Sequence, residues 1–296
     1  MAGFGLLHSI ARLWRTVTRA EQSCETSVPS HLARSVGFAC FLVLSAPARA
    51  APNWPAAGAQ LDVLKLSTRA PERPWRIYLD AGHGAPGNTG NRSVTCEDEA
   101  DVMLALSDLV AAQLRATGRF QVMLSRKRAE TPRYQDRIAA AEAFHADAIV
   151  SLHSDARGEA HVWQPRPDAQ CLRNDTEPGE GVLFSDEGPP HLVAARARLA
   201  RSIAKYQSAA GFPLYSGEDW LTLYVHDSAP GVYIDRRPKR QRVYFLRKPR
   251  IPSVIVETHH ALDLEEAARW KEPRTVEAFT AGLAVGLDEA LRSARK

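Results

Sequence analysis

The sequence predicts an α/β fold, with a mainly parallel twisted sheet, helices on both faces of that sheet, and a single domain over residues 75–296. Two observations carry this prediction. Short apolar runs of strand type alternate along the chain with longer segments whose apolar residues recur at helical spacing. Such alternation is typical of parallel sheets, because two parallel neighbours need a long crossover that is usually a helix. A chain of 296 residues with 45% hydrophobic residues is large enough to bury the core of such a domain.

Helix boundaries are predicted from spacing and from stop signals. Residues 101–117 place Val102, Leu106 and Val110 on one helical face. Glycine follows this segment and the segment 190–210, and glycine favours the end of a helix. The predicted strands are 76–81, 121–125, 148–153, 181–185, 243–246 and 253–257, and the predicted helices are 101–117, 132–144, 190–210, 264–271 and 273–294.

Two segments interrupt the alternation of strands and helices. Residues 156–180 are rich in Pro, Asp and Arg, which predicts a loop. Residues 214–242 mix aromatic and charged side chains, and a basic run continues from Arg236 to Arg250. One interpretation of the second segment is a solvated loop with an edge strand. The other is a groove wall whose aromatic and guanidinium groups hold an acidic, sugar-bearing substrate.

Residues 1–50 are predicted to form an export signal peptide. Arg34 precedes an apolar run over residues 36–46, which is too short to span a bilayer but is typical of a signal peptide. Small residues at Ala48 and Ala50 then predict cleavage after Ala50, although an N-terminal core helix remains the alternative. We therefore expect a periplasmic or secreted protein with no stable membrane anchor after cleavage.

The mature chain is expected to begin with a leader or linker over residues 51–74, which contains four prolines. The formal net charge is +4, and residues 1–50, with five arginines and two glutamates, account for +3 of it. The nearly neutral remainder gives no support to nucleic-acid binding. Cleavage would also leave only Cys96 and Cys171, for which an oxidising compartment predicts one disulfide, with two unrelated free thiols as the alternative.

Four polar residues lie where the predicted strands and helices would present them together. His83, His153 and Glu257 each stand at or just after the end of a predicted strand, and Glu99 stands close to the start of a helix. The carboxyl ends of parallel strands line the ligand crevice of an open α/β sheet. Two imidazoles and one carboxylate form a zinc-ligand set that leaves a position open for water, and a further glutamate supplies proton transfer. This combination indicates metal-assisted hydrolysis of an amide.

Each of these residues also has an ordinary interpretation when taken alone. A histidine at a strand end can cap a loop, and a glutamate is favourable in the first turn of a helix in any case. Asp80, three residues before His83, is expected to orient that ring. Other hydrolase patterns are missing, because no histidine is followed by glutamate and no Gly-x-Ser-x-Gly step occurs.

The order of four motifs resembles a known family. They are Leu79-Asp80-Ala81-Gly82-His83-Gly84, Glu99-Ala100-Asp101-Val102, Ser151-Leu152-His153-Ser154-Asp155-Ala156 and Pro252-Ser253-Val254-Ile255-Val256-Glu257. Together they resemble the zinc-dependent N-acetylmuramoyl-L-alanine amidases of the AmiC-like (amidase-3) family.

The resemblance implies a peptidoglycan hydrolase that cuts the amide between N-acetylmuramic acid and the L-alanine of the stem peptide. It implies one Zn²⁺ per chain, held by His83, Glu99 and His153, with Glu257 as the catalytic carboxylate and residues 75–296 as the catalytic domain. The chain departs from the family after Glu257, where Thr258-His259-His260 follows in place of the usual glycine–aromatic step. Two alternatives stay open: a wall-binding protein with an amidase fold and weak activity, and a zinc amidase acting on a non-wall amide.

Overall fold

The computed structural model describes residues 61–220 and 222–294. The predicted signal peptide and the first part of the predicted leader lie outside the described residues. Residues 61–74 contain no helix or strand, and Leu61 packs into the main core. None of the described helices is both long and apolar enough to cross a bilayer.

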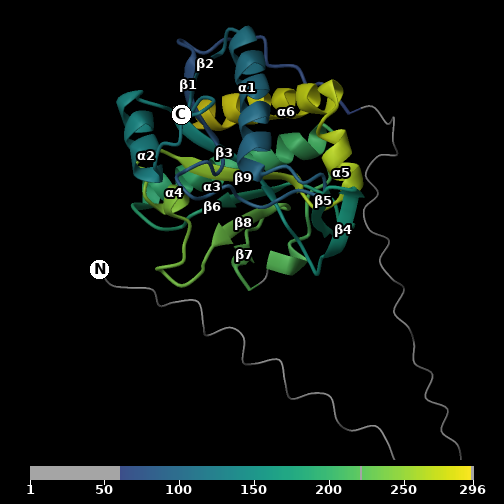
Figure 1. Cartoon of the computed structure of the whole chain (residues 1–296). Helices are drawn as coiled ribbons and strands as arrows, with labels where there is room; N and C mark the ends of the chain where they lie inside the picture. The colour runs from purple at the N-terminus through teal and green to yellow at the C-terminus, as the bar shows by residue number, and fades with distance from the viewer. Residues whose placement is uncertain (1–60, 221, 295–296) are drawn as a thin grey trace, which may run out of the picture. The chain divides into compact units, whose positions relative to one another are not determined.

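A seven-stranded mixed sheet forms the centre of the domain (Figure 1). Its strand order is β2-β1-β3-β9-β6-β8-β7, and all neighbours pair in parallel except β6 with β9 and β7 with β8. The predicted mainly parallel sheet is therefore confirmed. The strands are β1 (Trp75–Ala81), β2 (Phe120–Leu124), β3 (Ala148–Asp155), β6 (Gly181–Phe184), β7 (Tyr224–His226), β8 (Val232–Asp235) and β9 (Ser253–His260), and β4 (His161–Arg166) pairs with β5 (Ala169–Arg173) in a separate hairpin.

Helices cover both faces of the sheet, as predicted. Successive residues of a strand point to opposite faces, so Ile77 and Leu79 join the core formed with α1, α3 and α6, whereas Tyr78 packs with residues of α2 and α4. In Figure 1, α1 and α6 lie on one side of β3 and β9. The helices are α1 (Glu99–Ala116), α2 (Tyr134–Ala143), α3 (Pro190–Ala209), α4 (Tyr244–Arg247), α5 (Leu264–Arg269) and α6 (Pro273–Ser293), with a 3₁₀ turn η1 at Glu218–Trp220.

Two predictions from sequence need correction, and a third gains a further strand. Residues 243–246 were predicted as a strand, but Val243 is the N-cap of the short helix α4 and the other three residues belong to that helix, in which Phe245 and Leu246 pack into two different apolar clusters. A four-residue apolar run has no periodicity that separates strand from helix. Residues 156–180 are not only loop, since they contain the β4–β5 hairpin. The segment 214–242 supplies the edge strand β7, as one interpretation expected, and also β8 inside the sheet.

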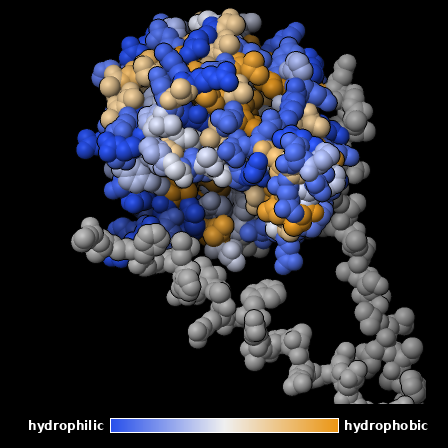
Figure 2. Space-filling model, viewed as in Figure 1, coloured by the Kyte–Doolittle hydropathy of each residue, from blue (hydrophilic) through white to orange (hydrophobic). Residues whose placement is uncertain are grey.

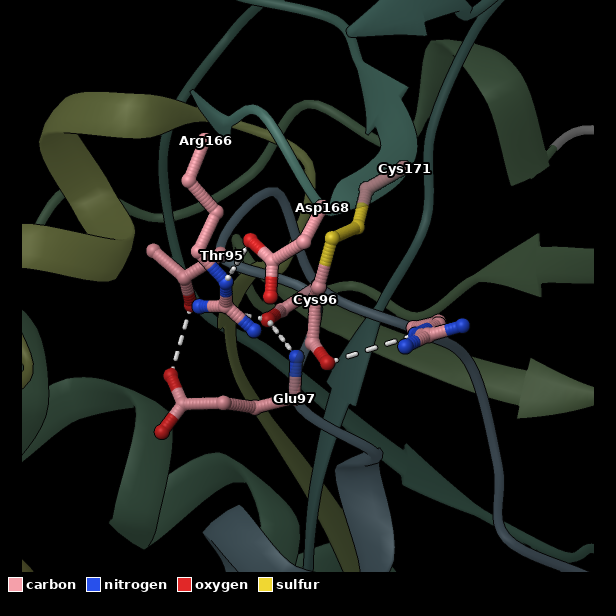
Figure 3. Close-up of a disulfide and its surroundings, with 8 residues drawn as sticks. Thr95, Cys96, Glu97, Arg166, Asp168 and Cys171 are labelled. Atoms are coloured by element: carbon pink, nitrogen blue, oxygen red, sulfur yellow. Dashed lines mark hydrogen bonds and ion pairs between the residues drawn. A yellow bond between two sulfur atoms is a disulfide. The ribbon is translucent and has the colours of Figure 1, made fainter. Parts of the chain in front are cut away.

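A disulfide joins Cys96 and Cys171, as predicted (Figure 3). Their Cα atoms lie 5.5 Å apart, which is within the usual range for a disulfide. Cys171 belongs to β5, and Cys96 lies three residues before α1 begins with Glu99. The bond therefore ties the hairpin to the loop that leads into α1.

Apolar side chains gather between α1 and α6 on a face that is otherwise mostly hydrophilic (Figure 2). A cavity of about 780 Å³ lies there, with Leu106, Trp270 and Val276 among its lining residues. None of His83, Glu99, His153 or Glu257 lines this cavity. It is therefore separate from the site predicted at the strand ends.

Candidate metal and catalytic site

His83 lies in the loop that follows β1, with a backbone φ of 58°. This left-handed conformation is uncommon for a residue other than glycine and indicates a loop held by its surroundings. Arg137 donates to the His83 carbonyl at 2.7 Å, and the His83 Nδ1 atom lies 2.8 Å from Asn88 Oδ1. The orienting partner of the ring is therefore Asn88, and the expectation that Asp80 fills this role is wrong. Asp80 instead accepts hydrogen bonds from Arg137 and from the Ser151 hydroxyl.

Glu99 is the first residue of α1 and is only 3% exposed. Its Oε2 atom lies 3.0 Å from His83 Nε2, and its Oε1 atom lies 3.1 Å from His153 Nδ1. Burial raises the pKa of Glu99, but the hydrogen bonds from both imidazoles more than offset burial and hold that pKa well below its usual range. The carboxylate is therefore charged and bridges the two histidines.

His153 is carried by β3, and its ring centroid lies 4.7 Å from that of His83 in an edge-to-face arrangement. Burial lowers the pKa of each histidine, yet the hydrogen bond and charge of Glu99 make the net shift upward for both. One donor atom from each of His83, Glu99 and His153 lies within 4.8 Å of the other two. The fold thus brings the three predicted ligands together, although they are 16 and 54 residues apart along the chain.

At two glycines the backbone approaches these side chains so closely that no larger residue would fit. A Cβ atom at Gly90, where φ is +79°, would lie 2.5 Å from Glu99 Oε2. A Cβ atom at Gly82 would lie 2.7 Å from the His153 ring. Two imidazoles and a carboxylate are also the donor set that zinc takes in open catalytic sites. The residues present therefore fit a metal ion.

Glu257 lies beside this cluster and is not part of it. Glu257 lies opposite His153 in the parallel pairing of β9 with β3. Burial raises the pKa of Glu257 to about 8, and the positive charge of His153 opposes that shift. Its buried Oε2 atom makes no hydrogen bond within the described part of the chain. A carboxyl group in this environment exchanges a proton near neutral pH.

Two buried arginines that hold the site together were missed by the sequence analysis. Arg126 donates to the carbonyls of Gly82 at 3.1 Å and Ala100 at 2.6 Å. It therefore links the residue before His83 to the residue after Glu99. Arg137, which lies on α2, donates to the His83 carbonyl. Neither arginine stands in a distinctive local pattern, so no sequence signal identified them.

His259 and His260 have structural roles and lie outside the metal cluster. The His259 ring stacks on Trp270 with centroids 5.3 Å apart, and burial lowers its pKa to about 3. His260 Nδ1 accepts a hydrogen bond from the Arg157 backbone. Both histidines are buried, and burial also lowers the pKa of His260.

Three cations of the basic run from Arg236 to Arg250 form ion pairs within the protein. Arg236 binds Asp186, Arg237 binds Asp235, and Arg242 binds Glu187 at 2.7 Å. No residue of this run lines the cavity next to Glu257. Together with the edge strand β7, these observations favour the interpretation of a solvated loop with an edge strand over that of a groove wall.

The fold and these residues define an α/β domain in which a candidate metal site of two histidines and a glutamate adjoins a buried carboxyl group. The chain belongs to the N-acetylmuramoyl-L-alanine amidase family (Amidase_3), which it matches over residues 77–289. The resemblance noted from the four motifs is therefore confirmed at the level of the family.

Individual relatives agree with this assignment. The chain is 28% identical over 207 residues to the probable N-acetylmuramoyl-L-alanine amidase AmiB of Haemophilus influenzae, covering 65% of this chain and 46% of that protein. It is 22% identical over 239 residues to the N-acetylmuramoyl-L-alanine amidase AmiC of Escherichia coli, covering 76% of this chain and 56% of that protein. The chain thus spans about half the length of these curated relatives.

A solved structure shares the fold. The N-acetylmuramyl-L-alanine amidase Ami1 of Mycobacterium smegmatis superposes with a TM-score of 0.57 at 21% identity, covering 75% of this chain and 98% of that one. At this level of identity the likeness shows a common fold, and the chemistry has to be argued from the residues of the site.

Proposed function

We propose that this protein is a zinc-dependent peptidoglycan hydrolase that cleaves the amide between N-acetylmuramic acid and the L-alanine of the stem peptide. The observation that carries the proposal is the cluster of His83, Glu99 and His153 with the buried carboxyl of Glu257 beside it. Membership of the amidase family supports both the type of bond and the substrate.

In this proposal one Zn²⁺ is held by His83, Glu99 and His153. Zinc supplies Lewis-acid chemistry when bound: it polarises a carbonyl group and lowers the pKa of water from ~15.7 towards ~7. The chain supplies ligands that are already in place, because Asn88 orients the His83 ring and Asn91 and the Ser154 backbone hold the Glu99 carboxylate.

Glu257 is proposed to move the proton. Without metal its pKa of about 8 keeps it mostly protonated at neutral pH. A cation on the neighbouring ligands favours the charged carboxylate and therefore lowers that pKa. Glu257 can then take a proton from the attacking water and return it to the alanine nitrogen, which leaves as a neutral amine.

The proposed substrate lies outside the cytoplasm, which agrees with the signal peptide predicted over residues 1–50. We propose that the protein acts in the periplasm or is secreted after cleavage following Ala50. N-terminal sequencing of protein from the native cell envelope is expected to begin at Ala51. A mature protein that still begins at Met1 would contradict this part of the proposal.

Digestion of purified peptidoglycan sacculi tests the activity itself. The zinc-loaded protein is expected to release stem peptides with a new N-terminal alanine and to leave glycan chains free of new reducing ends. The matched control is the same protein stripped with a chelator, with and without added zinc. Binding to sacculi without release would favour the weakly active wall-binding alternative, and cleavage of only soluble amides would favour a non-wall substrate.

A further inference from the structure

A second cavity, of about 530 Å³, adjoins Glu257. It opens between the chain that follows β3 and the segment around η1. None of the three candidate metal ligands lines it, so it extends from the catalytic carboxyl group and not from the metal cluster. Its lining residues are Asp155, Ala156, Gly158, Glu159, Asp219, Trp220, Leu223, Tyr224 and Glu257.

The charge of this lining is one-sided. It contains four carboxyl groups, those of Asp155, Glu159, Asp219 and Glu257, and no lysine or arginine. Arg157, which lies two residues after Asp155, is buried and does not line the cavity. Its guanidinium binds Asp155 at 2.7 Å and donates to two backbone carbonyls.

Two of these carboxyl groups keep a buried oxygen without a donor. Asp155 binds Arg157 through Oδ2, while its Oδ1 atom makes no hydrogen bond within the described residues. The Oε2 atom of Glu257 is in the same condition. A buried polar atom without a hydrogen-bond partner is costly, so its presence at a cavity indicates a site that a bound polar group completes.

The two remaining carboxyl groups face the cavity without an ionic partner. Asp219 accepts a hydrogen bond from the Tyr215 hydroxyl at 2.8 Å and makes no ion pair in the described part of the chain. Glu159 is exposed and likewise has no ion pair there. Trp220 and Tyr224 add aromatic surface to the same wall. Carboxylates beside aromatic rings suit a primary ammonium group on an aliphatic stem and disfavour an anionic one.

The position of Glu257 decides which half of the substrate reaches this cavity. If Glu257 returns its proton to the leaving nitrogen, the peptide half of the substrate must lie on its side of the scissile bond. We propose that this cavity binds the stem peptide and selects peptides that carry a free ammonium group, with Asp219 and Glu159 as its recognition residues. This inference rests on the proposed amidase function.

A pair of synthetic substrates tests the selection. The probes are muramoyl tripeptide amides whose third residue is either lysine or norleucine, which differ only in the terminal ammonium group. Wild-type protein is expected to show a kcat/KM for the lysine probe that is higher by about two- to fivefold, the range of a partly exposed charge contact. In the double variant Asp219→Asn, Glu159→Gln this ratio is expected to fall to about one. The asparagine can still accept the Tyr215 hydrogen bond, so the fold around η1 is preserved.

Two controls make the result interpretable. Glu265→Gln removes a carboxylate that is 81% exposed on α5 and is expected to leave the ratio unchanged. Thermal unfolding and zinc content measured on each variant confirm that fold and metal site are intact. Equal cleavage of both probes by wild type, or an unchanged ratio in the double variant, would overturn the inference.

A binding measurement separates this inference from the function on which it rests. Calorimetric titration with the free tripeptide amides needs no turnover. Tighter binding of the lysine peptide, lost in the double variant, supports the cavity assignment even if neither muramoyl probe is cleaved, an outcome that would reject the amidase function alone. Cleavage of both probes with no preference in rate or in binding would reject the cavity assignment and leave the function standing.

Discussion

Glu257 and His153 are direct register partners on the parallel strands β9 and β3. This pairing places a buried carboxyl group beside a histidine that also contacts Glu99 through Nδ1. The two residues differ in their surroundings. His153 is one of the three residues whose donor atoms converge, and Glu257 is not. The ligand role proposed for His153 and the proton-transfer role proposed for Glu257 agree with this arrangement, and experiment can separate the two roles.

Substitution of a proposed metal ligand and substitution of the proposed proton-transfer residue are expected to impair the protein in different ways. His83→Ala removes a proposed ligand, so it should lower both zinc content and activity. Glu257→Gln should keep zinc bound and lower kcat by about 10²–10⁴-fold, the usual contribution of general acid–base catalysis. Metal analysis beside stem-peptide release measures both effects. Near-full activity of Glu257→Gln would exclude the proton-transfer role, and loss of zinc would make Glu257 a ligand and require Glu99 to be reconsidered.

The raised pKa of Glu257 makes a prediction for the metal-free protein. Its carboxyl group has a pKa of about 8 when folded and about 4.3 when unfolded, so folding favours the protonated form. The stability that this group contributes is therefore fully present below pH ~4.3 and is lost as the pH rises through 8. Urea unfolding at several pH values should show wild type losing stability relative to Glu257→Gln over this window. A constant difference between the two proteins would show that the carboxyl group is not buried as described.

Arg126 is expected to support metal binding without touching the metal. It holds the carbonyls of Gly82 and Ala100, so Arg126→Met should loosen the segments that carry His83 and Glu99. Loss of such support typically weakens metal affinity by about 10–100-fold. Competition with a zinc chelator measures the change, and Arg133→Met, at a side chain 64% exposed in a surface ion pair, is the matched control. Equal zinc affinity in the two variants would leave Arg126 without this role.

The disulfide is expected to stabilise the domain. Cys96 and Cys171 close a loop of 75 residues, and removal of such a link typically costs about 2–4 kcal/mol of unfolding free energy. Urea unfolding of the double variant Cys96→Ala, Cys171→Ala should show this loss relative to oxidised wild type. Reduced wild type is the second comparison, because it lacks the bond but keeps both sulfur atoms. Two alkylatable thiols in protein from the envelope would contradict the pairing.

Local sequence was sufficient to predict the strands and helices that depend mainly on neighbouring residues. Strands such as β1 and β9 were visible as apolar runs, and α1 was visible from apolar spacing that ends at Gly118. His83, His153 and Glu257 were also visible, because polar groups at the ends of buried strands are unusual, and Glu99 was identified through the motif at the start of a helix. Family resemblance then gave each of them a proposed role.

Tertiary structure decided what depends on contacts between distant segments. Residues 243–246 carry too little periodicity for their helical state to be predicted, and only packing between two apolar clusters selects it. The hairpin β4–β5 depends on cross-strand pairing inside a polar segment. Arg126 and the carboxylate-lined cavity have no local signature, because each is assembled from residues that meet only in the folded chain. The sequence by itself determined which residues carry the proposed chemistry, and the tertiary structure alone decided what holds them and what surrounds them, since burial and charge pairing depend on the whole fold.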